Sequence, residues 1–272
     1  MTPKLRHIHV EDNHFQHLQV LKTNRNKRHR YQEFCVEGVR PINSLLTHGW
    51  EVNAFYYPGK RKLSDWAKKI LASSQAHYHF EVAPALMDKL SEKEDTSELL
   101  AAVKMPANDL ARIRSHPAML VVILDRPNSP GNLGTSVRSC DVFGVDGVII
   151  TGHAADIYHP QVVRGSMGSL FAQTVVQVAE QKTLLDWLAG IRESMGSLQI
   201  VGSSEKAAVK VDELKVRGPT VLVAGNETFG MSAKFQELSN TMIAIPQYGW
   251  ASSLNLSCAL SIMLYEISKQ RR

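Results

Sequence analysis

The chain has 272 residues, enough for one or two domains with substantial cores. Its content of 44% hydrophobic and 21% charged residues is that of a globular protein, and no repeat or low-complexity segment is present. The 31 Lys and Arg residues against 26 Asp and Glu residues give a net charge of +5 and a pI of about 9.1, a mild indication of a polyanionic partner.

The cysteines and the hydropathy pattern indicate which classes of protein can be excluded. Cys35, Cys140 and Cys258 are far apart and form no CxxC pair, so neither a disulfide framework nor a zinc cluster is expected. The N-terminal stretch lacks an apolar signal segment, and apolar runs such as residues 118–124 are too short to span a bilayer. We therefore expect a cytoplasmic protein with no membrane partner and no bound metal.

The first 30 residues show little hydrophobic pattern. Residues 22–30, KTNRNKRHR, form a dense basic run without an acidic residue. Two interpretations stay open, a solvated flexible segment or a patch that contacts phosphate groups. The overall positive charge favours the second, with Lys27, Arg28 and Arg30 as candidate RNA-binding residues. We expect residues 1–30 to be flexible.

Regular structure is predicted from residue 31 onward. Hydrophobic alternation predicts strands, and Ser64 and Gly49 are placed to begin and end helices. The predicted strands are residues 34–36, 52–57, 78–82 and 99–104, and the predicted helices are residues 40–47, 64–73 and 84–90. This alternation predicts a small α/β domain that spans residues 1–104.

A second basic cluster, within residues 60–69, lies beside Tyr56, Tyr57 and Trp66. Positive charge next to exposed rings suits single-stranded or looped RNA, in which bases stack and phosphates pair. A surface helix with half-buried rings explains the pattern equally well.

The spacing of the predicted strands and helices becomes longer after residue 104. Residues 105–117 hold two prolines and are expected to link two domains. Beyond them, strands are predicted at residues 118–124, 147–151, 174–178, 198–202, 220–224 and 242–245, and helices after residue 131 and at residues 159–171, 183–194, 232–238 and 253–269. Continuous apolar runs are typical of a parallel sheet covered on both faces, so residues 118–272 are predicted to form a doubly wound α/β domain.

Small polar residues follow three of these strands, at the edge where parallel α/β sheets bind ligands. Each set alone is also what a turn with a helix cap contains, but three together favour a ligand site. They are Asn128, Gly131, Asn132, Gly134 and Arg138; Gly225, Asn226 and Glu227; and Pro246, Gly249, Ser253 and Asn255. The motifs GxGxxG, GxxxxGK[ST] and GxSxG are absent, which argues against a dinucleotide fold, a P-loop and an α/β-hydrolase.

The same three stretches resemble the three motifs of the SpoU (TrmH) family of RNA ribose 2′-O-methyltransferases, within the SPOUT superfamily. PGNLGTSVRSCDVFG matches the first motif, VAGNETFGMS the second and IPQYGWASSLNLSCALSIMLYE the third. HPQVVRGSMGSLF is similar to the segment between the first two motifs. The resemblance covers about residues 118–270. Thr228, Phe229 and Trp250 are bulkier than the family pattern and are candidates for shaping the target pocket.

The resemblance implies a C-terminal domain with a deep trefoil knot that binds S-adenosylmethionine and works as a homodimer, with the site near the subunit interface. The implied cofactor-binding residues are Gly225, Asn226, Ile245, Pro246 and Leu254. The implied catalytic residues are Arg138, Asn132, Glu227, Ser253 and Asn255. Arg164, in the segment between motifs, is carried over as an RNA-binding residue.

The roles implied for these side chains follow their chemistry. A guanidinium stays protonated in proteins, so Arg138 is expected to clamp a phosphate and polarise the 2′-hydroxyl rather than act as a base. Asn132, Ser253 and Asn255 would orient Arg138, the ribose or the cofactor. Glu227 would hold an arginine or loop amides, or cap the helix near Met231.

The N-terminal part resembles, more loosely, the ribosomal-protein-like substrate-binding domain that many of these enzymes carry. The matching pieces include YQEFCVEGVRPINSLL and MDKLSEKEDTSELLAAV. By analogy this domain implies a ribosomal RNA substrate. A tRNA substrate and a non-catalytic RNA-binding protein on the same fold are the alternatives.

Overall fold

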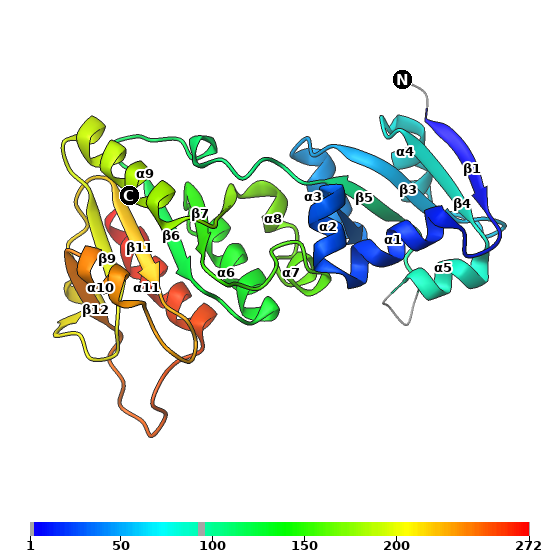
Figure 1. Ribbon diagram of the computed structural model, residues 1–272. Coiled ribbons are helices and arrows are strands. Elements are labelled where there is room, and N and C mark those ends of the chain that lie inside the picture. The colour runs from blue at the N-terminus through cyan, green and yellow to red at the C-terminus, as the bar shows by residue number, and fades with distance from the viewer. Residues whose placement is uncertain (1–2, 92–95, 272) are drawn as a thin grey trace. The chain divides into compact units, whose positions relative to one another are not determined.

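The computed structural model describes residues 3–91 and 96–271. The chain divides into two compact units (Figure 1). Unit 1 comprises Met1–Pro106 and Tyr158–Phe171, and unit 2 comprises Ala107–Ile157 and Ala172–Arg272. This division differs from the predicted one, because residues 158–171 group with the N-terminal part.

Unit 1 is built on a five-stranded mixed sheet with the strand order β1-β4-β3-β5-β2. Strands β1, β4 and β3 are parallel, and β5 runs antiparallel to both β3 and β2. Its elements are β1 Lys4–Ile8, α1 Asn13–Thr23, α2 Arg25–Tyr31, β2 Glu33–Glu37, α3 Val39–Thr47, β3 Val52–Pro58, α4 Asp65–Ser73, β4 Tyr78–Val82, α5 Pro84–Leu90, β5 Leu100–Lys104, α7 Pro160–Gly165 and α8 Ser169–Ala172.

The prediction that residues 1–30 are flexible is wrong for the part that the structure describes. Asp12 caps helix α1 by accepting hydrogen bonds from the backbone N–H groups of His14 and Phe15. Phe15, Leu18 and Leu21 then lie on one face of α1 and are fully buried against the sheet. Burial of this apolar stripe orders the segment despite its polar composition.

Residues 158–171 pack on unit 1 through an aromatic cluster. The Phe34 ring lies 4.6 Å from the Tyr158 ring and 6.3 Å from the Phe171 ring. Trp50 Nε1 donates a hydrogen bond of 3.0 Å to the Phe171 carbonyl oxygen. The single helix predicted over residues 159–171 is in fact two short helices, because the chain takes positive φ angles at Met167 and Gly168.

Unit 2 is a seven-stranded parallel sheet with the order β10-β12-β9-β11-β6-β7-β8. This confirms the predicted doubly wound α/β architecture. Its elements are η1 Leu110–Arg112, β6 Leu120–Asp125, α6 Pro130–Val142, β7 Gly147–Thr151, β8 Val175–Val178, α9 Gln181–Met195, β9 Gln199–Ser203, β10 Val209–Lys210, η2 Val211–Glu213, β11 Thr220–Ala224, α10 Ala233–Leu238, β12 Thr241–Ala244 and α11 Leu256–Gln270.

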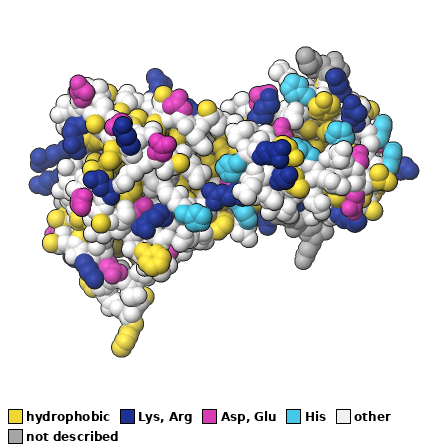
Figure 2. Space-filling model, viewed as in Figure 1, with side chains coloured by type: hydrophobic (Ala, Val, Ile, Leu, Met, Phe, Trp, Pro, Cys, Tyr) yellow, Lys and Arg dark blue, Asp and Glu magenta, His cyan; other side chains and the backbone are white. Residues whose placement is uncertain are grey.

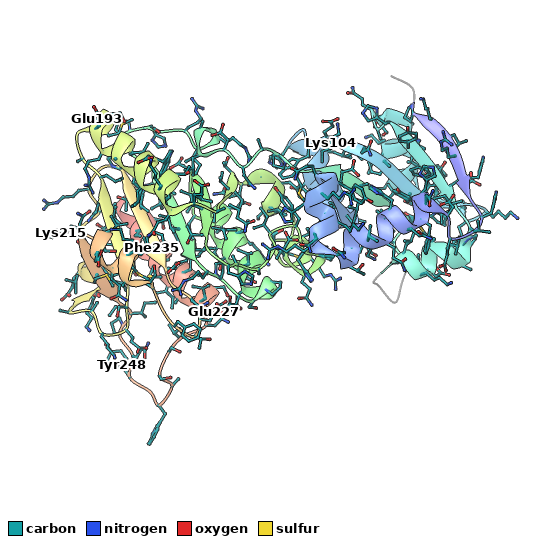
Figure 3. All side chains as sticks on the ribbon, in the orientation of Figure 1. Lys104, Glu193, Lys215, Glu227, Phe235 and Tyr248 are labelled. Atoms are coloured by element: carbon teal, nitrogen blue, oxygen red, sulfur yellow. The ribbon has the colours of Figure 1, made fainter. Side chains whose placement is uncertain are left out.

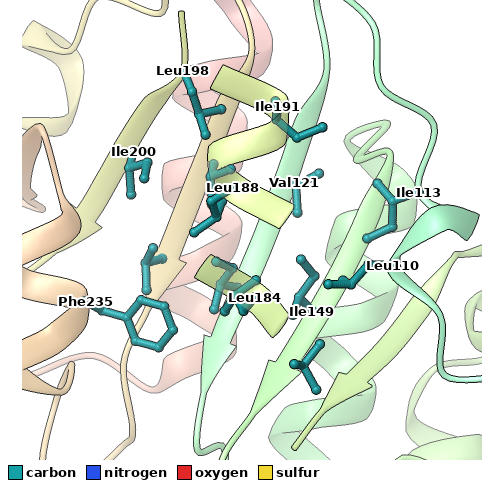
Figure 4. Close-up of a cluster of buried hydrophobic side chains, with 14 of the residues drawn as sticks. Leu110, Ile113, Val121, Ile149, Leu184, Leu188, Ile191, Leu198, Ile200 and Phe235 are labelled. Atoms are coloured by element: carbon teal, nitrogen blue, oxygen red, sulfur yellow. The ribbon is translucent and has the colours of Figure 1, made fainter. Parts of the chain in front are cut away.

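The core of unit 2 includes part of the segment predicted to be a linker. Leu184, Leu188 and Ile191 recur at helical spacing on α9 and pack over the sheet (Figure 4). Leu110 and Ile113 belong to the same buried cluster. Residues 107–117 are therefore a packed part of unit 2, and the boundary between the units falls at Pro106.

The sheet register brings the predicted motifs to one edge. Ala224 at the end of β11 pairs with Leu124 of β6, so the loops that follow these two strands begin side by side. Strand β9 lies between β11 and β12. Helices α6 and α11 pack together, and Ser139 Oγ lies 2.7 Å from Ser261 Oγ. Within the described residues, no helix is long and apolar enough to cross a membrane.

Candidate active site

A buried carboxylate joins the first and second motifs. Asp125, 3% exposed at the end of β6, accepts hydrogen bonds from the Ser232 N–H at 2.8 Å and from Thr151 Oγ1 at 3.3 Å. Arg126 Nε and one of its terminal nitrogens each donate to the same carboxylate at 3.1 Å. Sequence reasoning missed Asp125 and Arg126. The available signal was an acidic residue directly after a continuous apolar strand.

The second motif forms a tight turn organised by Asn226. Its Oδ1 accepts the N–H groups of Thr228 and Phe229 at 2.9 and 3.0 Å, and its Nδ2 donates to the Arg126 carbonyl at 2.7 Å. The backbones of Asn226 and Gly230 exchange two hydrogen bonds. A Cβ atom on Gly225 would lie 2.2 Å from the Met231 nitrogen, so only glycine permits this approach of the two backbone segments.

A hydrogen-bonded chain of side chains links all three motifs. Asn255 Nδ2 donates to Asn132 Oδ1 at 2.9 Å, and Asn132 Nδ2 donates to Glu227 Oε1 at 3.1 Å. The other Glu227 oxygen accepts the Asn128 N–H at 3.2 Å. The Asn132 amide thus donates on one side and accepts on the other, which fixes its orientation. Of the alternatives given for Glu227, an arginine, loop amides or a helix cap, the structure places a loop amide on it.

Asn255 also caps helix α11. Its Oδ1 accepts the Ser257 N–H at 2.9 Å and the Ser257 hydroxyl at 2.7 Å. The helix therefore begins at Leu256, three residues later than the predicted start at residue 253. Residues 245–255 form a long loop that projects from the sheet edge (Figure 1).

A cavity of about 620 Å³ lies at the carboxyl ends of β9, β11 and β12. This volume is within the range of about 300–1,000 Å³ typical of small-molecule sites. Four of the residues predicted to bind the cofactor line it, namely Gly225, Asn226, Ile245 and Leu254. Pro246 does not line it, whereas Glu227 and Ser253 do. Met242, Ile243 and Met263 add apolar wall, and Glu205, Lys206 and Gln236 add polar groups.

Arg138 stands apart from this network. It is exposed on α6, two turns beyond the N-terminal end of the helix, on the same face as Val142. Across the described residues, no hydrogen bond or ion pair holds its guanidinium. The structure therefore joins Asn132, Glu227 and Asn255 directly, places Ser253 on the cavity wall and leaves Arg138 open to solvent.

The predicted RNA-binding residues lie in unit 1. Arg28 is wrongly predicted as a phosphate contact, because it is only 2% exposed and donates hydrogen bonds to the carbonyl oxygens of Leu21 and Lys22. Lys27 and Arg30 lie on α2, partly and largely exposed respectively, and Arg164 is exposed on α7. In the second basic cluster Tyr56 is buried, so it offers no ring to a base.

The histidines show no metal-binding geometry. Within residues 3–91 and 96–271, no group of three or more His, Cys, Asp and Glu side chains is placed to hold a metal ion. His17 instead lies 2.8 Å from the Glu33 carboxylate, and the His7 ring stacks on the His9 ring.

The fold and the site together define a class of protein. It has a parallel α/β domain in which hydrogen bonds join three motif loops and the second and third of these loops line a cavity, and it has a small mixed-sheet domain. Residues 119–265 match the SpoU rRNA Methylase family, and residues 12–101 match the SpoU L30e-like domain. The chain belongs to the SpoU rRNA methylase family.

Known relatives share both units. The 23S rRNA (uridine(2479)-2′-O)-methyltransferase of Streptomyces viridochromogenes is 42% identical over 271 residues, which cover 99% of this chain and 94% of the relative. The crystal structure of the SpoU methyltransferase AviRb from that organism, in complex with AdoMet, superposes with a TM-score of 0.91 over 96% of this chain and 98% of that one, at 42% identity. An AdoMet-bound rRNA methyltransferase from Sinorhizobium meliloti is 25% identical, with a TM-score of 0.85 over 97% of this chain and 98% of its own.

Proposed function

We propose that this protein transfers a methyl group from S-adenosylmethionine to a ribose 2′-hydroxyl of ribosomal RNA. The observation that carries the proposal is the chain of hydrogen bonds from Asn255 through Asn132 to Glu227, because it ties the three family motifs to one another, and Glu227 also lines the cavity. The relative that is 42% identical is named as a 23S rRNA 2′-O-methyltransferase and is matched over nearly its whole length.

The residues of the cavity fit S-adenosylmethionine. This cofactor supplies a methyl group on a sulfonium centre that is already activated for displacement. Gly225 lets the second motif turn close against the cavity without a side chain in the way. Met242, Ile243 and Met263 give an apolar wall suited to a flat heterocycle. The main-chain groups of Gly225, Ile245 and Leu254 are the proposed cofactor contacts, with Asn226 shaping the turn and Pro246 the course of the third motif loop.

Catalysis is assigned to positioning and charge rather than to a strong base. The Asn132 amide is held on both sides, so it presents fixed donor and acceptor groups. Arg138 carries a charge free to clamp a phosphate in two-pronged geometry and to polarise the nearby hydroxyl. Alignment of the attacking oxygen contributes several kcal/mol in such reactions. Ser253 and Asn255 orient the ribose from the third motif.

The homodimer is proposed to form on the faces of α6 and α11. Val142, Ile262 and Tyr265 are apolar side chains exposed on these two helices, and the Phe143 ring packs edge-on against Tyr265. Exposed apolar residues gathered on adjacent helices mark an interaction surface. Arg138 is four residues from Val142, so a subunit docked there would stand beside the catalytic arginine. The trefoil knot of the family is proposed for the loops of unit 2.

Ribosomal RNA is proposed as the substrate because the match to the SpoU L30e-like domain extends over residues 12–101. Lys27, Arg30 and Arg164 are the proposed phosphate contacts. A cytoplasmic location accompanies this substrate. Transfer RNA is the competing substrate, since the chemistry at the ribose is the same in both.

The test uses radiolabelled S-adenosylmethionine with ribosomal RNA and tRNA prepared separately from a strain that lacks this protein. Label in ribosomal RNA that is lost with Arg138→Ala is the expected result. Label in tRNA alone would overturn the substrate and keep the chemistry. Label in neither RNA, with the cofactor bound in calorimetry, would overturn the assignment as a ribosomal RNA methyltransferase.

A further inference from the structure

Three aromatic side chains stand in solvent on the loops that border the cavity. Phe229 is 77% exposed on the second motif turn, and Tyr248 and Trp250 are almost wholly exposed on the loop of residues 245–255. Figure 3 shows Tyr248 on this loop, and Figure 2 shows hydrophobic side chains along it. Phe229 lines the cavity, and so do Gln247 and Ser252 on either side of Tyr248 and Trp250. We name Phe229, Tyr248 and Trp250 the aromatic rim.

The backbone of the turn that carries Phe229 is held by several hydrogen bonds, while its ring is exposed. Its N–H group donates to Asn226 Oδ1, and the Asn226–Gly230 backbone pair closes the turn around it. Arg126 donates a further hydrogen bond of 3.2 Å to the Gly230 carbonyl oxygen. The neighbouring Glu227 is fixed by Asn132 and Asn128. The backbone of this turn is therefore already ordered before a partner binds, so its ordering adds little to the entropic cost of binding.

The surroundings of the rim favour RNA over a second protein chain. Tyr248 and Trp250 are separated by Gly249 and followed by Ala251 and two serines, so they are isolated large apolar residues rather than part of a continuous apolar run. The exposed apolar residues of α6 and α11 supply such a face elsewhere in unit 2. Every nucleobase has a planar surface on which an isolated aromatic ring stacks, and unpaired nucleotides in loops leave that surface accessible.

We infer that the aromatic rim stacks on unpaired bases of the target RNA, which makes the substrate a looped or single-stranded segment rather than a duplex. Phe229, beside Glu227 and Asn132, stacks on the base of the nucleotide whose ribose enters the site. Tyr248 and Trp250 stack on flanking nucleotides. This inference rests on the proposed function, because it concerns how the RNA of that reaction is held.

The test compares leucine and tyrosine at two rim positions in the full-length protein saturated with S-adenosylmethionine. Phe229→Leu and Trp250→Leu keep an apolar side chain but lose the flat ring, whereas Phe229→Tyr and Trp250→Tyr keep it. Binding of protein-free large-subunit ribosomal RNA is measured by filter retention. The leucine variants are expected to weaken RNA binding roughly 10-fold and the tyrosine variants less than about threefold. The Kd for S-adenosylmethionine, from calorimetry, is expected to stay within about twofold in the Trp250 variants, because Trp250 is not among the residues that line the cavity, whereas Phe229 is.

Each other outcome has a distinct meaning. Leucine variants that bind ribosomal RNA like the wild type would overturn the inference and leave the proposed function intact. Leucine variants that instead shift the sedimentation of the protein towards monomer would assign the rim to the second subunit. Wild-type protein that binds S-adenosylmethionine but neither binds nor methylates ribosomal RNA would overturn the proposed function, and the inference with it.

Discussion

Gly225→Ala, which adds a single methyl group, should weaken cofactor binding. A Cβ atom there would lie 2.2 Å from the Met231 nitrogen and 2.3 Å from the Gly230 carbonyl carbon. Both are backbone atoms, so no side chain can rotate away. Relief to an ordinary contact of 3.4 Å requires the turn to move by about 1.2 Å. Gly225→Ala should therefore displace the cavity wall that the second motif forms.

The magnitude follows from that displacement. A misplacement of about 1 Å costs up to roughly 100-fold in a positioned site, so we expect the Kd for S-adenosylmethionine to rise 10- to 100-fold. At a cofactor concentration 100 times the wild-type Kd, binding stabilises the wild type by about 2.7 kcal/mol, but a variant with 100-fold weaker binding by only about 0.4 kcal/mol. Calorimetry gives the Kd, and thermal unfolding with and without cofactor gives the loss of ligand stabilisation.

Gly131→Ala is the matched control for this experiment. Gly131 lies in the first turn of α6, and an added Cβ would meet only Ser129 Oγ, at 3.9 Å. Its cofactor affinity should equal that of the wild type. Wild-type affinity in Gly225→Ala as well would refute the reasoning, since it would mean that the turn absorbs the methyl group without moving the cavity wall.

Three further predictions test other parts of the site. Arg138→Lys should bind S-adenosylmethionine normally but methylate RNA at least about 10-fold more slowly in a single turnover. The reason is that an ammonium group cannot clamp a phosphate with two parallel hydrogen bonds. A near-normal rate of methyl transfer would exclude the clamp. Asp125→Asn should lower the free energy of unfolding in urea by about 1–3 kcal/mol, because it removes the charge of a buried carboxylate that accepts several hydrogen bonds and pairs with the partly exposed Arg126. A loss below about 0.5 kcal/mol would mean that the carboxylate does not hold the motif loops. Cys258 is exposed on the same face of α11 as Tyr265, so the proposed dimer should shield its thiol. Tyr265→Glu should therefore yield a monomer whose Cys258 reacts faster with a thiol reagent than Cys258 of the wild type. Equal reaction rates would contradict dimerisation on this face.

The elements with strong periodicity were predictable from sequence, and the weakly patterned ones were not. The strand at residues 220–224 was predicted to the residue, because the four apolar residues that follow Thr220 form a continuous run, as is typical of a strand buried on both faces of a parallel sheet. Helix α1 was missed because its apolar residues, Phe15, Leu18 and Leu21, are diluted by histidines and glutamines. The assignment of residues 158–171 was wrong because only tertiary packing on Phe34 and Trp50 reveals it.

In the site too, features with a local sequence pattern were predictable, and features that depend on tertiary contacts were not. Glycines and polar residues after three strands indicated where the motif loops meet. Asn132, Glu227 and Asn255 are hydrogen-bonded there, whereas Arg138 stands apart. Asp125 and Arg126 were not found, since the residues that bond the Asp125 carboxylate, Thr151 and Ser232, and the Gly230 carbonyl that accepts from Arg126 are distant in sequence. Arg28 was misread because a basic run gives no sign of which arginine turns inward to the carbonyl groups of α1.

The hydrogen bonds of the site also bear on where the proton of the 2′-hydroxyl goes. The Glu227 carboxylate is the acidic group of the three-motif network, and both of its oxygens already accept hydrogen bonds, from Asn132 and from the Asn128 N–H. Proton transfer to Glu227 would sacrifice an acceptor that ties the first motif to the second. Arg138 has no lone pair to offer while it is protonated. The proton is therefore assigned to water or to an RNA phosphate oxygen. On this assignment Glu227→Gln, which preserves an acceptor for one of the two donors, should slow methylation far less than Arg138→Ala, and a loss as large as that of Arg138→Ala would make Glu227 the base.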